Sequence, residues 1–145
     1  SNAVKKIILI SCVNKKKPHK AKAEELYLSP LFVSNLRYAK SLRPDNIFIL
    51  SAKYGLLELD REIEPYDVTL KGMSSAQVKA WASEVLEQLG KRTDLQSDHF
   101  IFLAGDKYRK HIIPYLASYE VPLQGMAIGK QLQYLAVQIH ESHLP

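Results

Sequence analysis

Three short runs of apolar residues recur along this chain, and they constrain its fold more than any other feature. They cover residues 6–11, 46–51 and 99–104, and they share a β-branched and aromatic character. A continuous apolar run of this length is typical of a β-strand that is covered on both faces. The sequence therefore predicts strands in the middle of a sheet, with helices packed on its two sides.

Helical patterns separate these runs. Ser29 is a suitable N-cap because Pro30 can occupy the first helical position after it. Ser74 and Gln77 form a capping-box pattern ahead of an apolar stripe, and Gly90 is expected to end that helix. The expected helices cover residues 30–41, 75–89, a stretch after Asp106 that Pro114 shortens, and 128–142.

The order of these elements predicts the fold class. Strands alternate with helices, and a short fourth strand is expected near residues 120–123. This alternation favours an α/β fold in three layers, a mostly parallel sheet of about four strands with helices on both faces. A chain of 145 residues fits a single α/β domain, which we place at 4–145, and residues 1–3 resemble the remnant of an expression tag. The irregular segment 57–73 is apolar enough to pack against this domain.

Lysines are concentrated near the amino terminus of a chain whose net charge is +5. Such a cationic patch can attract phosphate backbones in a salt-dependent way. A solvated lysine loop that only maintains solubility is the alternative interpretation. The lysines that precede the first acidic residue, Glu24, are Lys5, Lys6, Lys15, Lys16, Lys17, Lys20 and Lys22.

The sequence contains no apolar stretch of the roughly 18 residues that a helix needs to cross a bilayer. It also shows no signal peptide. The single cysteine, Cys12, cannot form an internal disulfide, which agrees with a reducing compartment. We therefore expect a cytoplasmic protein that does not bind membranes, and we make no prediction of its oligomeric state.

Small and polar residues follow each predicted strand, in the segments 11–15, 51–55 and 104–108. Ligands of open α/β sheets bind outside the carboxyl ends of the strands, so these segments are expected to line one cleft. Each segment also supplies a lysine. The sequence therefore predicts a functional site at this edge, with 51–55 at its centre.

Four residues are candidates for catalysis: Cys12, Lys53, Glu64 and Asp67. Cys12 would be a nucleophile if nearby lysines lowered the pKa of its thiol, and a small buried cysteine is the alternative. At a strand end, the Lys53 ammonium would bind an anion or lose its proton, unless it only pairs with Glu64 or Asp67. The acidic segment could fold over the site or simply close a turn.

The expected ligand-binding residues lie after the strands and at the start of the last helix. Tyr54 and Tyr66 can stack on a base, or they can be structural tyrosines. Gly129 and Lys130 begin a helix whose free N–H groups can hold a phosphate or a carboxylate. The full set is Ser11, Lys15, Tyr27, Ser51, Tyr54, Gly55, Tyr66, Gly105, Tyr108, Gly129 and Lys130.

These motifs also carry a resemblance to known families. The chain resembles a small bacterial and phage family of unknown function over nearly its whole length. Ser51, Tyr54 with Gly55, and the segment 63–66 are also similar to the peroxide-stress protein YaaA family, which implies DNA binding and protection from oxidative damage. The segments that carry the first resemblance are 11–16, 26–32, 51–57, 64–67, 104–109 and 125–131.

We expect a nucleic-acid-associated protein that places a nucleotide or base in the strand-end cleft, with Lys53 and Lys130 binding phosphate. Its partner would be DNA, RNA or a free nucleotide, in nucleic-acid modification or stress protection. One alternative is an enzyme acting on a small nucleoside-like metabolite, with Cys12 or Lys53 as nucleophile and Glu64 or Asp67 as acid or base. Another is a non-catalytic interaction module. We predict no metal and no cofactor.

Overall fold

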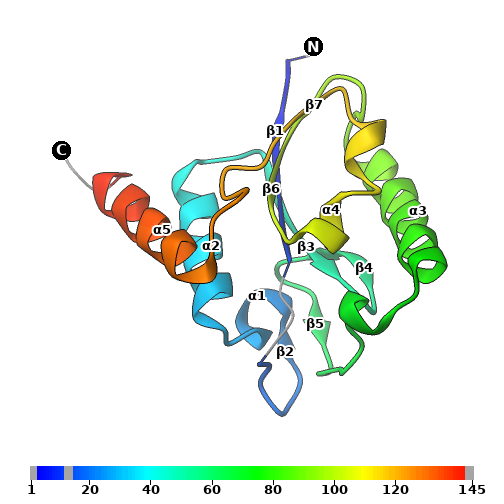
Figure 1. Cartoon of the computed structure of the whole chain (residues 1–145), viewed down its shortest axis with the longest axis horizontal. Helices are drawn as coiled ribbons and strands as arrows, with labels where there is room; N and C mark the ends of the chain where they lie inside the picture. Colours follow the sequence, from blue (N-terminus) through cyan, green and yellow to red (C-terminus); the bar gives the residue numbers. More distant parts are fainter. Residues whose placement is uncertain (1–2, 12–14, 143–145) are drawn as a thin grey trace.

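The three apolar runs form the central strands of a five-stranded sheet (Figure 1). β1 (Lys6–Ser11) pairs in parallel with β3 (Asn46–Ser51) on one side and with β6 (His99–Leu103) on the other. β7 (Ser118–Glu120) continues the sheet in parallel beyond β6, and β4 (Gly55–Glu58) runs antiparallel beside β3. The computed structural model describes residues 3–11 and 15–142, and the strand order is β4-β3-β1-β6-β7.

The α/β class with a mostly parallel sheet is confirmed, but the sheet is mixed and has five strands where about four were expected. The unexpected strand is β4. It follows β3 after the turn 52–54, which is too short for the crossover that a parallel pair requires, so the chain must reverse. Gly55 accommodates that reversal with a φ of +74°.

The helices at residues 30–41 and 128–142 match the sequence-based bounds, whereas the helix expected after Asp106 is a single turn that begins at Asp106 itself, and the short helix at residues 23–26 was not expected. The Ser29 hydroxyl accepts a hydrogen bond from the Phe32 N–H at 3.2 Å and caps α2, and the predicted capping box is present at the start of α3. The expected end at Gly90 is wrong, because both the N–H and the hydroxyl of Thr93 bond to the Leu89 carbonyl and carry α3 further. The helices are α1 (Ala23–Leu26), α2 (Pro30–Ser41), α3 (Ser75–Arg92), α4 (Asp106–Arg109), α5 (Ile128–Ser142) and the 3-10 turns η1 (Leu70–Gly72) and η2 (Ile113–Tyr115).

Alternate side chains of β1 face two separate apolar clusters. Ile8 and Ile10 pack in the cluster that contains Phe32 of α2 and Leu135 of α5. Ile7 and Leu9 pack in the cluster that contains Trp81 and Val85 of α3. Figure 1 shows α2 and α5 on one side of the sheet and α3 on the other. Within the described ranges, no helix is both long enough and apolar enough to cross a bilayer.

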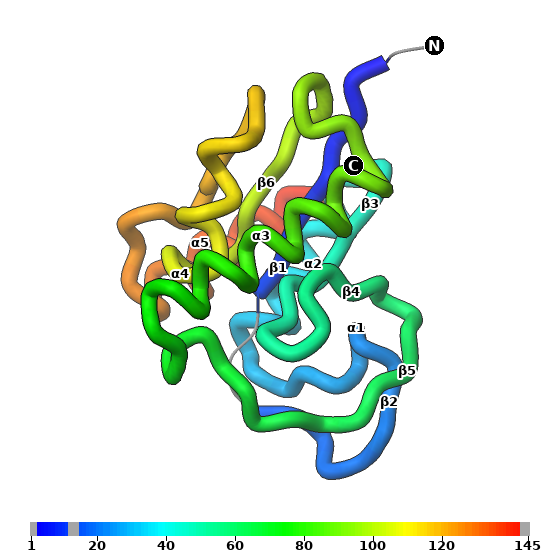
Figure 2. Tube along the Cα trace, turned by 90° about the vertical axis from the view of Figure 1, so that its right-hand side faces the viewer, coloured from blue at the N-terminus to red at the C-terminus, as the bar shows by residue number. Residues whose placement is uncertain are grey.

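A small cap lies below the carboxyl ends of the parallel strands in both views (Figures 1 and 2). It consists of α1 and a two-stranded antiparallel sheet of β2 (Ala21–Lys22) and β5 (Glu62–Ile63). The prediction that segment 57–73 packs against the fold is confirmed, because Ile63, Tyr66 and Leu70 are buried. The cap therefore places residues from two distant connections beside the strand ends.

Candidate functional site

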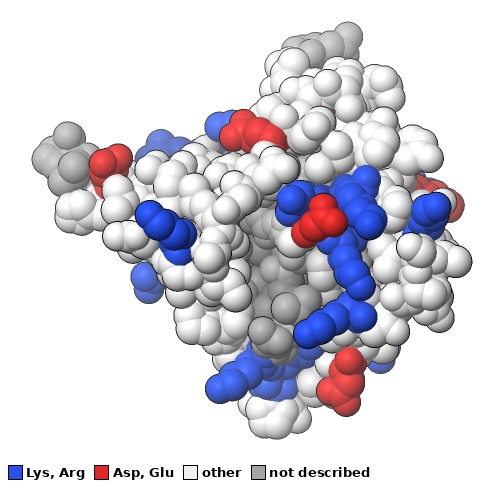
Figure 3. Space-filling view, in the orientation of Figure 1, with Lys and Arg blue, Asp and Glu red and all other residues white. Residues whose placement is uncertain are grey.

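A pocket of about 550 Å³ opens at the carboxyl ends of β1 and β6. Ser11 closes it from β1, segment 102–106 from β6, and the first turns of α2 and α5 supply the facing walls. Figure 3 shows the surface hollowed beside α4. This is the edge of the sheet at which the sequence predicted a site.

Apolar side chains make most of the pocket wall. Leu31 from α2, Leu103 from β6 and Met126 from the loop before α5 are among them. Polar groups are fewer and come from separate elements. A concave apolar wall with a few placed polar groups is the usual composition of a site for a small organic ligand.

Arg109 is the cationic side chain of this wall, and its side chain is only 14% exposed. Its Nη1 donates a hydrogen bond to the Ala104 carbonyl at 2.7 Å, and its Nη2 lies 4.0 Å from the Asp106 carboxylate. A guanidinium has five N–H donors, so these contacts leave donors for a ligand. The Gly105 N–H donates to the Ser11 hydroxyl at 3.3 Å, which joins the ends of β6 and β1.

Asn35 also lines the pocket, from the middle of α2. It is 3% exposed, and its Oδ1 is buried without a hydrogen-bond partner among the residues that the structure describes. The sequence analysis did not select Asn35 as a functional residue. The signal was present, since Asn35 is a polar residue on the face of a helix that turns toward the core.

Next to the pocket, three hydroxyl groups form a buried network. Ser51 donates to the Tyr66 hydroxyl at 2.9 Å, and Tyr66 shares a 2.6 Å hydrogen bond with Tyr27. The Ser51 hydroxyl accepts from the N–H groups of Lys53 and Tyr54, at 3.3 and 3.0 Å. The network therefore fixes the turn after β3 to the cap.

Cations cover the tyrosine rings of this network. The ammonium of Lys16 lies 4.4 Å from the ring centre of Tyr66, which is 9% exposed. The Tyr54 ring has the Lys53 ammonium at 5.3 Å and the Arg61 guanidinium at 5.0 Å. Each contact lies within the usual cation–π range, so the ring faces already have partners.

The turn between β3 and β4 is also held from α3. Gln88 accepts a hydrogen bond from the Leu56 N–H at 2.8 Å and donates to the Tyr54 carbonyl at 3.3 Å. Gly55 lies against this amide, because a Cβ placed on it would be 2.3 Å from the Gln88 Oε1. A glycine therefore suits position 55 for two reasons: it adopts a left-handed backbone conformation, and it leaves room for the Gln88 side chain.

The sequence-predicted site residues do not all meet in one pocket. Ser11, Gly105 and Tyr108 line it, whereas Tyr27, Ser51, Tyr54, Gly55 and Tyr66 belong to the cluster around the hydroxyl network and its turn. The exposed candidates outside the pocket lining are Lys15, Lys53, Glu64, Asp67, Gly129 and Lys130, and Cys12 lies outside the described residues.

Charge around the pocket is mainly positive on the face that Figure 3 shows. Lys and Arg side chains gather over α4 and along the lower edge of the hollow. Lys107 and Lys110 of this region are exposed. The mouth of the pocket therefore has cations that an anionic ligand could approach.

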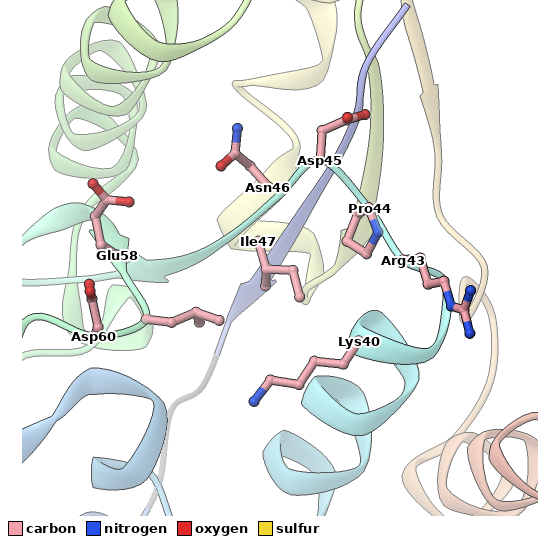
Figure 4. A pocket seen from close by; sticks show the side chains of 9 residues that line it. Lys40, Arg43, Pro44, Asp45, Asn46, Ile47, Glu58 and Asp60 are labelled. Atoms are coloured by element: carbon pink, nitrogen blue, oxygen red, sulfur yellow. The ribbon is translucent and has the colours of Figure 1, made fainter.

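A second hollow, of about 510 Å³, lies at the opposite end of the sheet, where β3 begins (Figure 4). Glu58 and Asp60 lie on one side of it and Lys40 and Arg43 on the other. Lys40 pairs with Glu24 at 3.0 Å, and Glu58 pairs with an arginine of α3. Because this hollow is shallow and both Lys40 and Glu58 already have ion-pair partners, we take the strand-end pocket as the candidate site.

A titratable cluster lies away from the pocket, where α2 meets α5. Burial raises the pKa of the Tyr38 phenol from 10.0 to about 12, with further contributions from Tyr134 and the negative charge of Glu120. The rings of Tyr38 and Tyr134 meet edge to face at 6.4 Å. This cluster supports the helix pair rather than the site.

Comparison with known proteins identifies a family and a relative of this chain. The model of a family of unknown function (DUF6884) matches residues 7–137. An uncharacterized protein of Bacillus subtilis strain 168, YfjM, is 32% identical over an alignment of 157 residues that covers 97% of this chain and 99% of that protein. The predicted membership of a family of unknown function is confirmed, and the relation to the YaaA family stays a prediction.

Proposed function

This chain belongs to the DUF6884 family of unknown function, and we propose that it holds a nucleobase or nucleotide, free or within a nucleic-acid strand, in the strand-end pocket. The observation that carries this proposal is the pocket itself, with about 550 Å³ of space, apolar walls and a few polar groups. A nucleobase is flat and apolar on its faces and polar on its edge, which suits such a wall.

The cations at the mouth support a phosphate-bearing ligand. Arg109 lines the pocket, and the exposed Lys107 lies beside it in α4. The net charge of +5 adds a long-range attraction for polyanions, which weakens as salt is added. A base in the pocket with its phosphate at the mouth would use both features.

In this proposal the apolar walls of the pocket hold the base, and the tyrosines next to it have a structural role. Tyr66 is buried, hydrogen-bonded to Ser51 and covered by Lys16, so its ring has little surface for a ligand. Lys53 and Lys130 are exposed and remain candidates for contacts with a longer nucleic-acid strand. Roles in nucleic-acid modification or in oxidative stress stay predictions of the resemblance to YaaA.

Calorimetric titration tests the proposal with nucleosides, nucleotides and short single-stranded oligonucleotides at low salt. Gly105 lines the pocket, has an ordinary φ of −65° and leaves open space where a side chain would begin, so Gly105→Leu should obstruct the pocket without strain. We expect this variant to weaken binding by at least about tenfold. Gly72→Leu, at an exposed glycine with similar open space, is the matched control.

Two results would contradict the proposal. One is that the unchanged protein binds no member of the panel at low salt. The other is that Gly105→Leu, folded by circular dichroism, binds as tightly as Gly72→Leu does.

A further inference from the structure

Asn35 occupies a position in α2 that is unfavourable for an asparagine. It lies in the middle of a twelve-residue helix, where asparagine has a poor helix propensity. It is also 3% exposed, and within residues 3–11 and 15–142 its buried Oδ1 has no hydrogen-bond partner. Buried polar atoms are nearly always hydrogen-bonded, so this amide requires an explanation.

Several other polar side chains of the pocket are engaged with the protein. The Gln131 amide donates to the Met126 carbonyl at 2.9 Å, and the Ser29 hydroxyl caps α2. Arg109 is anchored to the Ala104 carbonyl. Among the described lining residues, Asn35 is thus the one whose buried side-chain atom is recorded without a partner.

The two ends of the Asn35 amide can exchange positions. The torsion that turns an asparagine amide is broad, so a rotation can turn the edge that carries both Oδ1 and Nδ2 toward the pocket. An amide presents an acceptor and a donor side by side. The complementary ligand presents an N–H donor beside an acceptor, as adenine does with its amino group and a ring nitrogen.

We propose that Asn35 reads the hydrogen-bonding edge of the base, with Oδ1 accepting from a base N–H and Nδ2 donating to the neighbouring base acceptor. This inference rests on the proposed function and adds the chemical class of the ligand to it. The base N–H would supply the hydrogen bond that the Asn35 Oδ1 does not receive from the described residues. Such a site rejects analogues that lack the N–H, because the buried oxygen then stays unpaired.

The first experiment changes the ligand. Adenosine, cytidine, guanosine and uridine are titrated by calorimetry, and the tightest binder is compared with its methylated derivative that lacks the N–H donor. We expect the derivative to bind about 10- to 100-fold more weakly, which corresponds to one lost hydrogen bond and one unsatisfied buried acceptor. Ribose 5-phosphate, which has no base, should bind more weakly than the corresponding nucleotide.

The second experiment changes the protein. Asn35→Leu keeps nearly the same shape and removes the amide, so the melting temperature of the ligand-free protein should stay the same or rise. The affinity for the best nucleoside should fall about 10- to 100-fold. Gln133→Met is the matched control, because Gln133 is an exposed residue of α5 outside the pocket lining, and it should change the affinity by less than about threefold.

The outcomes separate this inference from the proposed function. Suppose that nucleosides bind, that Asn35→Leu binds them as tightly as the unchanged protein does, and that the methylated derivative binds as tightly as its parent. The role of Asn35 in recognising the base is then refuted, while the proposed function is not. If Asn35→Leu melts at a much lower temperature, the amide is structural and the inference is also refuted. If no nucleoside, nucleotide or oligonucleotide binds, the proposed function fails and this inference fails with it.

Discussion

Replacing Gly55 by alanine tests how the turn after β3 is built. The first cost is conformational, because a φ of +74° is a left-handed conformation that costs an L-residue about 1–2 kcal/mol. The second cost is steric, because the new Cβ would lie 2.3 Å from the Gln88 Oε1 and displace that amide. If the Gln88 amide loses its hydrogen bonds to Leu56 and Tyr54, the destabilisation grows by about 1–3 kcal/mol. We expect Gly55→Ala to lower the free energy of unfolding by about 2–5 kcal/mol.

Urea denaturation followed by circular dichroism measures this free energy. Gly125→Ala is the matched control, because Gly125 has a φ of +81° and open space where a Cβ would be. It should cost only about 1–2 kcal/mol. In a Gln88→Ala background the clash is absent, so Gly55→Ala should then cost the same as Gly125→Ala. Equal losses for Gly55→Ala and Gly125→Ala in the unchanged background would refute this account of the turn.

Two further substitutions test the hydroxyl network and the buried phenol of Tyr38. Tyr66→Phe removes the hydroxyl between Ser51 and Tyr27, so urea denaturation should show that the free energy of unfolding falls by about 1–3 kcal/mol. Tyr119→Phe, at an exposed tyrosine, should lower it by less than about 0.5 kcal/mol. A loss no larger than that of Tyr119→Phe would show that the network contributes little. Because the pKa of Tyr38 is raised to about 12, the unfolded chain loses this proton first, and the free energy of unfolding should fall by about 2–3 kcal/mol between roughly pH 10 and 12. Tyr38→Phe should flatten that fall, and parallel pH curves for the two proteins would contradict the assignment.

The three central strands and the bounds of α2 and α5 could be predicted because their determinants are local. An apolar run covered on both faces, as in β1, needs no knowledge of its partners to be recognised. Ser29 and the capping box at Ser74 likewise depend on residues within one helical turn. Gly90 misled the prediction because a helix tolerates an exposed glycine when a later residue, here Thr93, completes its end.

The site was harder to predict because its contacts are distant in sequence. The sequence predicted a site at the carboxyl ends of the strands, and Ser11 and Gly105 do line a pocket there. The bond between Ser51 and Tyr66 could not be predicted, since β5 and its pairing with β2 place Tyr66 in the cap. Asn35 was overlooked because periodicity assigns it to the packed face of α2, while the loop before α5 decides whether a pocket lies beside it.

The hydroxyl network also determines how the strand-end region opens. Tyr27 follows α1, Ser51 ends β3 and Tyr66 follows β5, so three separate connections meet in a single buried group of bonds. Local opening of the cap must break these bonds, and with them the hold of Ser51 on the amide protons of Lys53 and Tyr54. Those two amides should therefore exchange with solvent together, at the rate at which the cap lifts as one cooperative unit.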